Sequence, residues 1–248
     1  MMRSTVLLLV AVCLLLTPQL SMTTHSKTQR CSPTPTPDGL IASWAAETVA
    51  HLKGRVDVRV LINSTTQSMR VPIHKVETEI IALPLSTQDI ATAERLSLRL
   101  NSIISLNLVE ETSFARADLF ITAVCEPEHH TDYGIVTSNK AGDKLIMLIN
   151  TCSDVYRNYK GSFGPIFLHE LGHVLGLEHP FDASDGDCMI STVQFGPKSA
   201  HTGHTLMAYR EAPKGGSLDF YTATDIQALL KIWGPNRPRQ MSTQHPTR

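Results

Sequence analysis

The sequence predicts an α+β domain of the α/β-like kind, in which a twisted mixed sheet packs against two long helices. Three short stretches, VDVRVLI, ADLFITAV and KLIMLIN, have the length and the Val, Ile and Leu content of strands. Helical spacing appears instead in residues 86–103 and around HELGHVLGLEH. Few such patterns follow Gly176, so we expect a smaller, mostly irregular C-terminal lobe.

The first strand is predicted from alternation. In VDVRVLI the apolar residues of one face alternate with Asp57 and Arg59 on the other; the apolar residues are Val56, Val58, Val60 and Ile62. A period of two residues is typical of a strand that is buried on one side. The runs ADLFITAV and KLIMLIN are apolar at nearly every position, which favours the interior or the rim of a sheet.

The helix boundaries follow from capping residues. Ser86 or Thr87 can accept a hydrogen bond from the first turn of the helix that follows them. The helix that contains HELGH is expected to begin after Pro165. A last helix is expected to begin near Thr224 and to end at Gly234, which a proline follows.

The stretch HELGHVLGLEH, residues 169–179, has the pattern of a metal site. Residues four apart share a helix face, so His169 and His173 suit one Zn²⁺ at about 2.0–2.1 Å from each ring nitrogen. Glu170 can reach a water on such a metal without being a ligand. Gly176 predicts a helix end and a sharp turn that brings back His179 as a third ligand. Three protein ligands leave a position for water, which indicates a catalytic site.

The full HExxHxxGxxH string resembles the extended zinc motif of the metzincin metalloproteases. TLMAYR places Met207 where metzincins carry a methionine-containing turn beneath the zinc. HPFD after the helix, and Tyr209 two residues after Met207, are similar to serralysin-like catalytic domains rather than to matrixins. The residues after Gly234 contain no glycine-aspartate calcium repeats of the serralysin kind. A bound calcium ion is compatible with the sequence, but no pattern in it indicates one.

The resemblance implies a zincin, or metzincin, catalytic domain that hydrolyses peptide bonds as a zinc-dependent endopeptidase with one catalytic Zn²⁺. A zinc-activated water would attack the carbonyl, with a glutamate as general base. The family also implies that KLIMLIN is the exposed rim strand for an extended peptide, although an ordinary edge strand fits the sequence as well. The residues given a role are the metal ligands His169, His173 and His179, the catalytic residues Glu170 and Tyr209, and Met207 of the turn.

Two other functions compete with an endopeptidase. A catalytically inactive secreted relative could keep the zinc and bind a peptide or protein, but it would have no chemical use for Glu170. A structural zinc module would need a fourth Cys or His at suitable spacing, which the sequence lacks. The pairs His129 with His130 and His201 with His204 could form a second metal site; we interpret them as solvated histidines.

The N-terminus predicts secretion. Arg3 precedes an apolar run over residues 6–16, the pattern of a signal peptide and too short for the roughly 20 residues of a membrane span. We therefore expect a secreted, extracellular or periplasmic protein without stable membrane association after signal removal. The predicted organisation is a signal peptide at 1–21, a Ser/Thr/Pro-rich linker or short pro-segment at 22–38, the metzincin-like domain at 39–236 and a flexible tail at 237–248.

Charge and cysteine content limit the partners and the compartment. The formal net charge of −1, without long charged runs, gives no indication of a nucleic-acid partner. We expect a monomer that acts on a protein or peptide substrate.

Signal removal leaves four cysteines and hence two disulfides with three possible pairings; the cysteines are Cys31, Cys125, Cys152 and Cys188. Cys125 and Cys152 each follow a predicted strand and could join strand ends. The surroundings of Cys31 loosely resemble the zinc-capping cysteine of matrixin propeptides, but a structural disulfide is our preferred interpretation.

Overall fold

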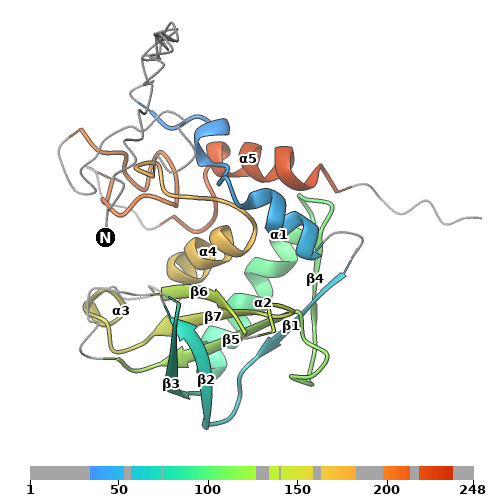
Figure 1. The fold of residues 1–248 in the computed structure, drawn as a ribbon. Coiled ribbons are helices and arrows are strands. Elements are labelled where there is room, and N and C mark those ends of the chain that lie inside the picture. Colours follow the sequence, from blue (N-terminus) through green and yellow to red (C-terminus); the bar gives the residue numbers. More distant parts are fainter. Residues whose placement is uncertain are drawn as a thin grey trace, which may run out of the picture. The chain divides into compact units, whose positions relative to one another are not determined.

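The computed structural model describes residues 34–52, 57–73, 75–126, 134–139, 141–158, 163–182, 198–212 and 218–236. They form a mixed α+β architecture (Figure 1). The elements, in chain order, are η1 (Asp38–Leu40), α1 (Ala45–Leu52), β1 (Asp57–Ile62), β2 (Gln67–Ile73), β3 (Val76–Ala82), α2 (Thr87–Asn101), β4 (Asn107–Glu110), β5 (Leu119–Val124), β6 (Gly134–Ser138), β7 (Leu145–Asn150), α3 (Asp154–Asn158), α4 (Phe163–Val174) and α5 (Ala223–Trp233).

Five of the described strands form a sheet in the order β4–β1–β5–β7–β6. The first four run parallel to one another, and β6 runs antiparallel to β7. Strands β2 and β3 form a separate antiparallel hairpin. Figure 1 shows α4 lying across the sheet beside β6 and β7, and helix α4 also packs against α2.

Both faces of the central strands β5 and β7 are buried. Alternate residues along each strand belong to two different apolar clusters, one packed against helices α2 and α4 and the other against the β2–β3 hairpin. This burial explains why their sequences are apolar at successive positions instead of alternate ones. The residues that face the helices are Leu119, Ile121, Ala123, Met147 and Ile149, and those that face the hairpin are Phe120, Val124, Ile146 and Leu148.

The prediction that KLIMLIN forms the exposed rim strand is wrong. Strand β7 pairs with β5 on one side and with β6 on the other, so it lies inside the sheet. The strand at this end of the sheet is β6, with the sequence GIVTS. GIVTS is short and only partly apolar, and therefore gives a weak strand pattern.

The start of α2 and both ends of α5 lie at, or within one residue of, the positions predicted from the sequence. Ser86 caps α2, and its hydroxyl accepts the Asp89 N–H at 3.1 Å. Helix α5 begins at Ala223, one residue before the expected position. It ends at Trp233, and Gly234 then adopts a φ of +74°.

A disulfide joins Cys125 to Cys152, each of which follows a central strand. The suggestion that these two cysteines join neighbouring strand ends is confirmed. Closing a loop across their 27-residue separation stabilises the fold by about 3–4 kcal/mol through loop-closure entropy. Such a bond is typical of oxidising compartments, including the cell exterior and the periplasm.

Several predictions concern residues that the structure does not describe. They are those for the signal peptide, the linker up to residue 33, the tail, Cys31, Cys188, His129 and His130.

None of the helices in the described part of the chain combines the length and the apolarity that crossing a membrane requires.

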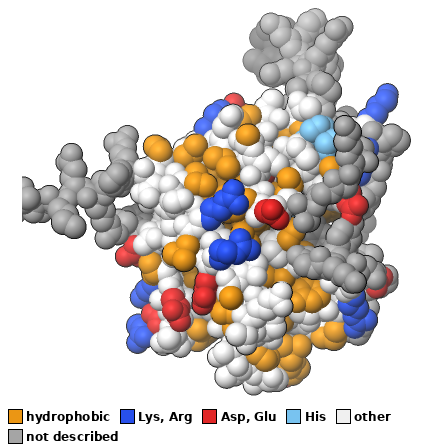
Figure 2. Space-filling model, turned by 180° about the vertical axis from the view of Figure 1, so that it is seen from behind, with side chains coloured by type: hydrophobic (Ala, Val, Ile, Leu, Met, Phe, Trp, Pro, Cys, Tyr) orange, Lys and Arg blue, Asp and Glu red, His pale blue; other side chains and the backbone are white. Residues whose placement is uncertain are grey.

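Figure 2 shows one face of the molecule, where Lys and Arg side chains lie among Asp, Glu and apolar side chains. This mixture agrees with the near-neutral net charge.

Candidate active site

Helix α4 carries the first two histidines of the motif. It begins at Phe163 and not after Pro165, so that expectation is corrected. Pro165 lies in the first turn, where backbone N–H groups have no acceptor within the helix and a proline therefore costs no hydrogen bond. Most of the helix is buried, including His169 and Glu170.

The end of α4 reverses the chain as predicted. Gly176 has a φ of +97°, its N–H donates to the His173 carbonyl at 3.1 Å, and the Leu177 N–H donates to the Gly172 carbonyl at 2.8 Å. These two bonds define a Schellman motif, which needs a left-handed residue at the position of Gly176. The turn brings His179 back toward the helix.

The three histidines meet through their Nε2 atoms. The Nε2 of His179 lies 3.2 Å from that of His169 and 3.1 Å from that of His173. Nitrogen ligands in a tetrahedral zinc site lie about 3.3 Å apart, given metal–nitrogen distances of about 2.0–2.1 Å. Among the described residues, these three are the group of ligand-type side chains that could hold a metal ion.

Hydrogen bonds fix the tautomers that metal binding needs. The Nδ1–H of His169 donates to the Leu206 carbonyl at 2.9 Å, and that of His173 donates to the Leu177 carbonyl at 2.9 Å. A carbonyl can only accept, so each Nε2 keeps its lone pair. Burial lowers the pKa of all three imidazoles, that of His179 to about 3. Neutral rings are the form that binds a cation.

The predicted methionine turn lies directly beneath the helix. Met207 is fully buried, and a Cβ added to Gly172 would meet its Sδ at 2.6 Å. Only a glycine at position 172 therefore allows this packing. The preceding residue, Leu206, supplies the carbonyl that orients His169.

Asp225 anchors that turn from helix α5, and sequence reasoning missed it. Its buried carboxylate accepts hydrogen bonds from the Leu206 N–H at 2.9 Å and from the Thr205 hydroxyl. Burial raises the pKa of Asp225, while these hydrogen bonds oppose the rise. Asp225 also completes a capping box with Thr222. The spacing TATD, with threonine three residues before an acidic residue, was the sequence signal.

Glu170 follows His169 in α4, and its side chain is buried. Burial raises the pKa of its carboxyl to about 8. The first residue of β6, Gly134, packs against this side chain. A Cβ added to Gly134 would overlap the Glu170 Cγ, Cδ and Oε1 atoms. The edge strand thus leaves room for this carboxylate because it begins with glycine.

Gly134→Ala should therefore displace the Glu170 carboxylate and lower kcat/KM by about 10- to 100-fold for any reaction in which Glu170 takes part, because a misplacement of about 1 Å can have an effect of this size. Any metal binding by the three histidines should be unchanged. Gly164→Ala is the matched control, because its added Cβ meets Thr92 and Leu96 at ordinary contact distances of 3.6 and 3.7 Å. Wild-type kinetics in Gly134→Ala would show that the glycine is not needed.

Tyr209 stands among the metal-site rings. Its ring centroid lies 4.7 Å from that of His179 and 5.7 Å from that of His169. Phe181 stacks on His179 at 4.8 Å with an interplanar angle of 8°, and lies 5.0 Å from Tyr209. Sequence reasoning used HPFD only as a resemblance and missed this stacking. The Asp182 N–H donates to the His179 carbonyl at 3.0 Å, which closes the turn.

The second candidate metal pair does not gain further ligands. The rings of His201 and His204 stack with centroids 3.7 Å apart. The His201 Nδ1 accepts the Gly203 N–H at 3.1 Å. Within the described ranges, no third ligand-type side chain joins them in a metal-holding group.

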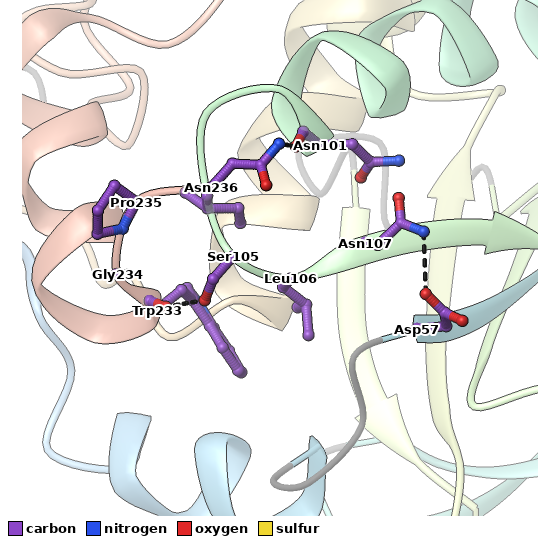
Figure 3. Close-up of a pocket in the computed structure, with 10 residues that line it drawn as sticks. Asp57, Asn101, Ser105, Leu106, Asn107, Trp233, Gly234, Pro235 and Asn236 are labelled. Carbon is purple, nitrogen blue, oxygen red and sulfur yellow. Dashed lines mark hydrogen bonds between the residues drawn. The ribbon is translucent and has the colours of Figure 1, made fainter. Parts of the chain in front are cut away.

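A cavity of about 490 Å³ lies at another place, between the α2–β4 turn and the end of α5 (Figure 3). Its lining contains none of the motif histidines. Asn236 donates to the Asn101 carbonyl at 2.9 Å, Asn107 donates to Asp57 at 2.9 Å, and Ser105 donates to the Trp233 carbonyl. These polar side chains are hydrogen-bonded within the cavity wall, and two of the three bonds attach the end of α5 to the α2–β4 turn.

Comparison with known proteins gives limited similarity. Serralysin G of Dickeya chrysanthemi is 38% identical over 74 residues, which cover 27% of this chain and 15% of serralysin G. No protein-family model matches the chain. The solved structure of the GM1-bound form of the ECX AB5 holotoxin aligns at 10% identity over 76% of this chain and 84% of that chain. Its TM-score of 0.42 is too low to support an argument.

Proposed function

We propose that the protein is a zinc-dependent endopeptidase, with His169, His173 and His179 as metal ligands. The observation that carries the proposal is the convergence of three imidazole Nε2 atoms on the helix that also carries the buried Glu170 and on the turn that follows it. Three histidines with an open fourth position are typical of a catalytic metal site. The partial similarity to serralysin G supports the same class of enzyme.

Each residue then has a role in hydrolysis of the peptide C–N bond. A zinc ion held by the three histidines would supply Lewis-acid polarisation of the peptide carbonyl and a bound water of lowered pKa. Glu170 accepts a proton from the attacking water and passes it to the leaving amine nitrogen. Tyr209 donates a hydrogen bond to the oxyanion that develops as the carbonyl carbon becomes tetrahedral. Met207 packs against Gly172 of the helix that carries His169 and His173, and takes no part in proton transfer.

The substrate is proposed to be an extended peptide beside β6. Among the described strands, β6 pairs with β7 alone, and its first residue contacts Glu170. An extended peptide can add to such an edge through backbone hydrogen bonds. This replaces β7 as the candidate rim strand.

Purified protein should cleave a peptide library and denatured protein, read out by mass spectrometry. A chelator should abolish cleavage, and added Zn²⁺ should restore it, because the activity depends on the metal. Folded, zinc-loaded protein that leaves the library intact would contradict the proposal. That result would favour the zinc-containing binding protein instead.

A further inference from the structure

The third histidine lies outside α4, so another part of the chain must fix its position. His173 is held within the helix, whereas His179 follows a turn of irregular backbone. A metal ligand set works only when its geometry is maintained by surrounding contacts. The residues that maintain residues 176–178 are therefore part of the site.

Those residues come from the beginning of the described chain. Ile41 forms an antiparallel bridge with Leu177. The Glu178 N–H donates to the Leu40 carbonyl at 3.0 Å, and the Ala42 N–H donates to the Gly176 carbonyl at 3.0 Å. We call residues 40–42 the N-terminal strap.

The N-terminal strap is itself held in place by burial. Leu40 is fully buried in the main core, and Ala42 is 3% exposed. Immediately after the strap, Ala45 covers the turn so closely that a Cβ on Gly176 would lie 2.9 Å from the Ala45 Cβ. The Trp44 ring centroid lies 6.4 Å from that of His173.

Residues 176–178, which pair with the strap, are adjacent to two of the proposed metal ligands. The Leu177 carbonyl accepts the Nδ1–H of His173, and His179 follows two residues later. On the other side, the Trp233 Nε1–H donates to the Leu175 carbonyl at 2.9 Å. The carbonyls of Leu175, Gly176 and Leu177 thus each accept a hydrogen bond that holds the turn after α4 in place.

We propose that the N-terminal strap is a positioning element for His173 and His179, and that zinc binding and strap pairing stabilise each other. The inference rests on the proposed metal site, but concerns metal affinity and not hydrolysis. By reciprocity, if the strap raises zinc affinity, zinc must strengthen the strap pairing by the same free energy.

The first test removes one hydrogen bond. Ala42→Pro deletes the N–H that bonds Gly176, and Ile41, with φ −93° and ψ 108°, already has the extended backbone that a following proline requires. Zinc affinity, measured by chelator competition on the full chain, should fall by about 10- to 100-fold. The d–d spectrum of the Co²⁺-loaded variant should also differ from wild type. Tyr156→Phe, which removes a hydrogen bond to Asp89 outside the strap, is the control and should bind zinc as wild type does.

The second test uses the wild-type chain and remains decisive if the proline variant does not fold. Hydrogen exchange is measured with and without Zn²⁺, with β2 as the internal reference. Zinc should slow exchange at the Ala42 and Glu178 amides by a larger factor than in β2. Equal slowing in both regions, or none at the strap, would overturn the inference, as would a folded Ala42→Pro protein with wild-type zinc affinity. Wild-type protein that binds no zinc would instead contradict the proposed function.

Discussion

Replacing Glu170 with glutamine is expected to lower kcat/KM for peptide hydrolysis by about 10²- to 10⁴-fold, because the amide cannot carry the proton from water to the leaving amine. The substitution preserves the shape of the side chain and leaves the three ligands untouched. Zinc content and the unfolding temperature of the zinc-loaded protein should therefore remain close to wild type. Glu170→Ala should lose activity to a similar degree.

Steady-state kinetics of zinc-loaded protein measure this effect, with Glu47→Gln as the control. Glu47 is an exposed glutamate in the first turn of α1, and its replacement should not change turnover. Unchanged turnover in Glu170→Gln would mean that another group carries the proton. Loss of zinc from that variant would mean that Glu170 supports the metal and not the reaction.

Replacing Tyr209 with phenylalanine is expected to lower kcat and kcat/KM together by about 10- to 1,000-fold, with KM nearly unchanged. The lost hydrogen bond forms mainly when the carbonyl becomes tetrahedral, so the substrate complex is little affected. The phenylalanine ring keeps the contacts with His179 and Phe181, and zinc should stay bound.

Tyr156→Phe provides the matched control. The Tyr156 hydroxyl donates to Asp89 at 3.0 Å, so its loss should cost about 1 kcal/mol of stability without changing turnover. If Tyr209→Phe behaves like this control, Tyr209 only packs beside the ligands. Oxyanion stabilisation would then be assigned to the metal alone.

The motif predicted the local geometry because its parts interact over a few residues. The i, i+4 spacing places His169 and His173 on one face, and Gly176 permits the left-handed turn before His179. The central strands were likewise recognisable, since burial on both faces makes them apolar throughout. The catalytic roles of Glu170 and Tyr209 stay predictions.

The parts that sequence reasoning missed depend on contacts between distant segments. Strand order follows from pairing across the sheet, so KLIMLIN could not be distinguished from an edge strand by its composition. Strand β6 is short, and its importance depends on Gly134 meeting Glu170. The strap contacts Gly176 and Glu178 through backbone atoms, which leave no signature in side-chain patterns. The domain boundaries at 39 and 236 remain predictions.

The most direct test of the metal site is the zinc content of folded protein, measured by elemental analysis after purification without added metal. We expect one tightly bound zinc per chain in the wild type and in Glu170→Gln, and much less than one in His179→Ala, because removal of a ligand weakens metal binding itself. A folded wild-type protein without zinc, or a His179→Ala protein that retains it fully, would contradict the assignment of His169, His173 and His179 as the metal site.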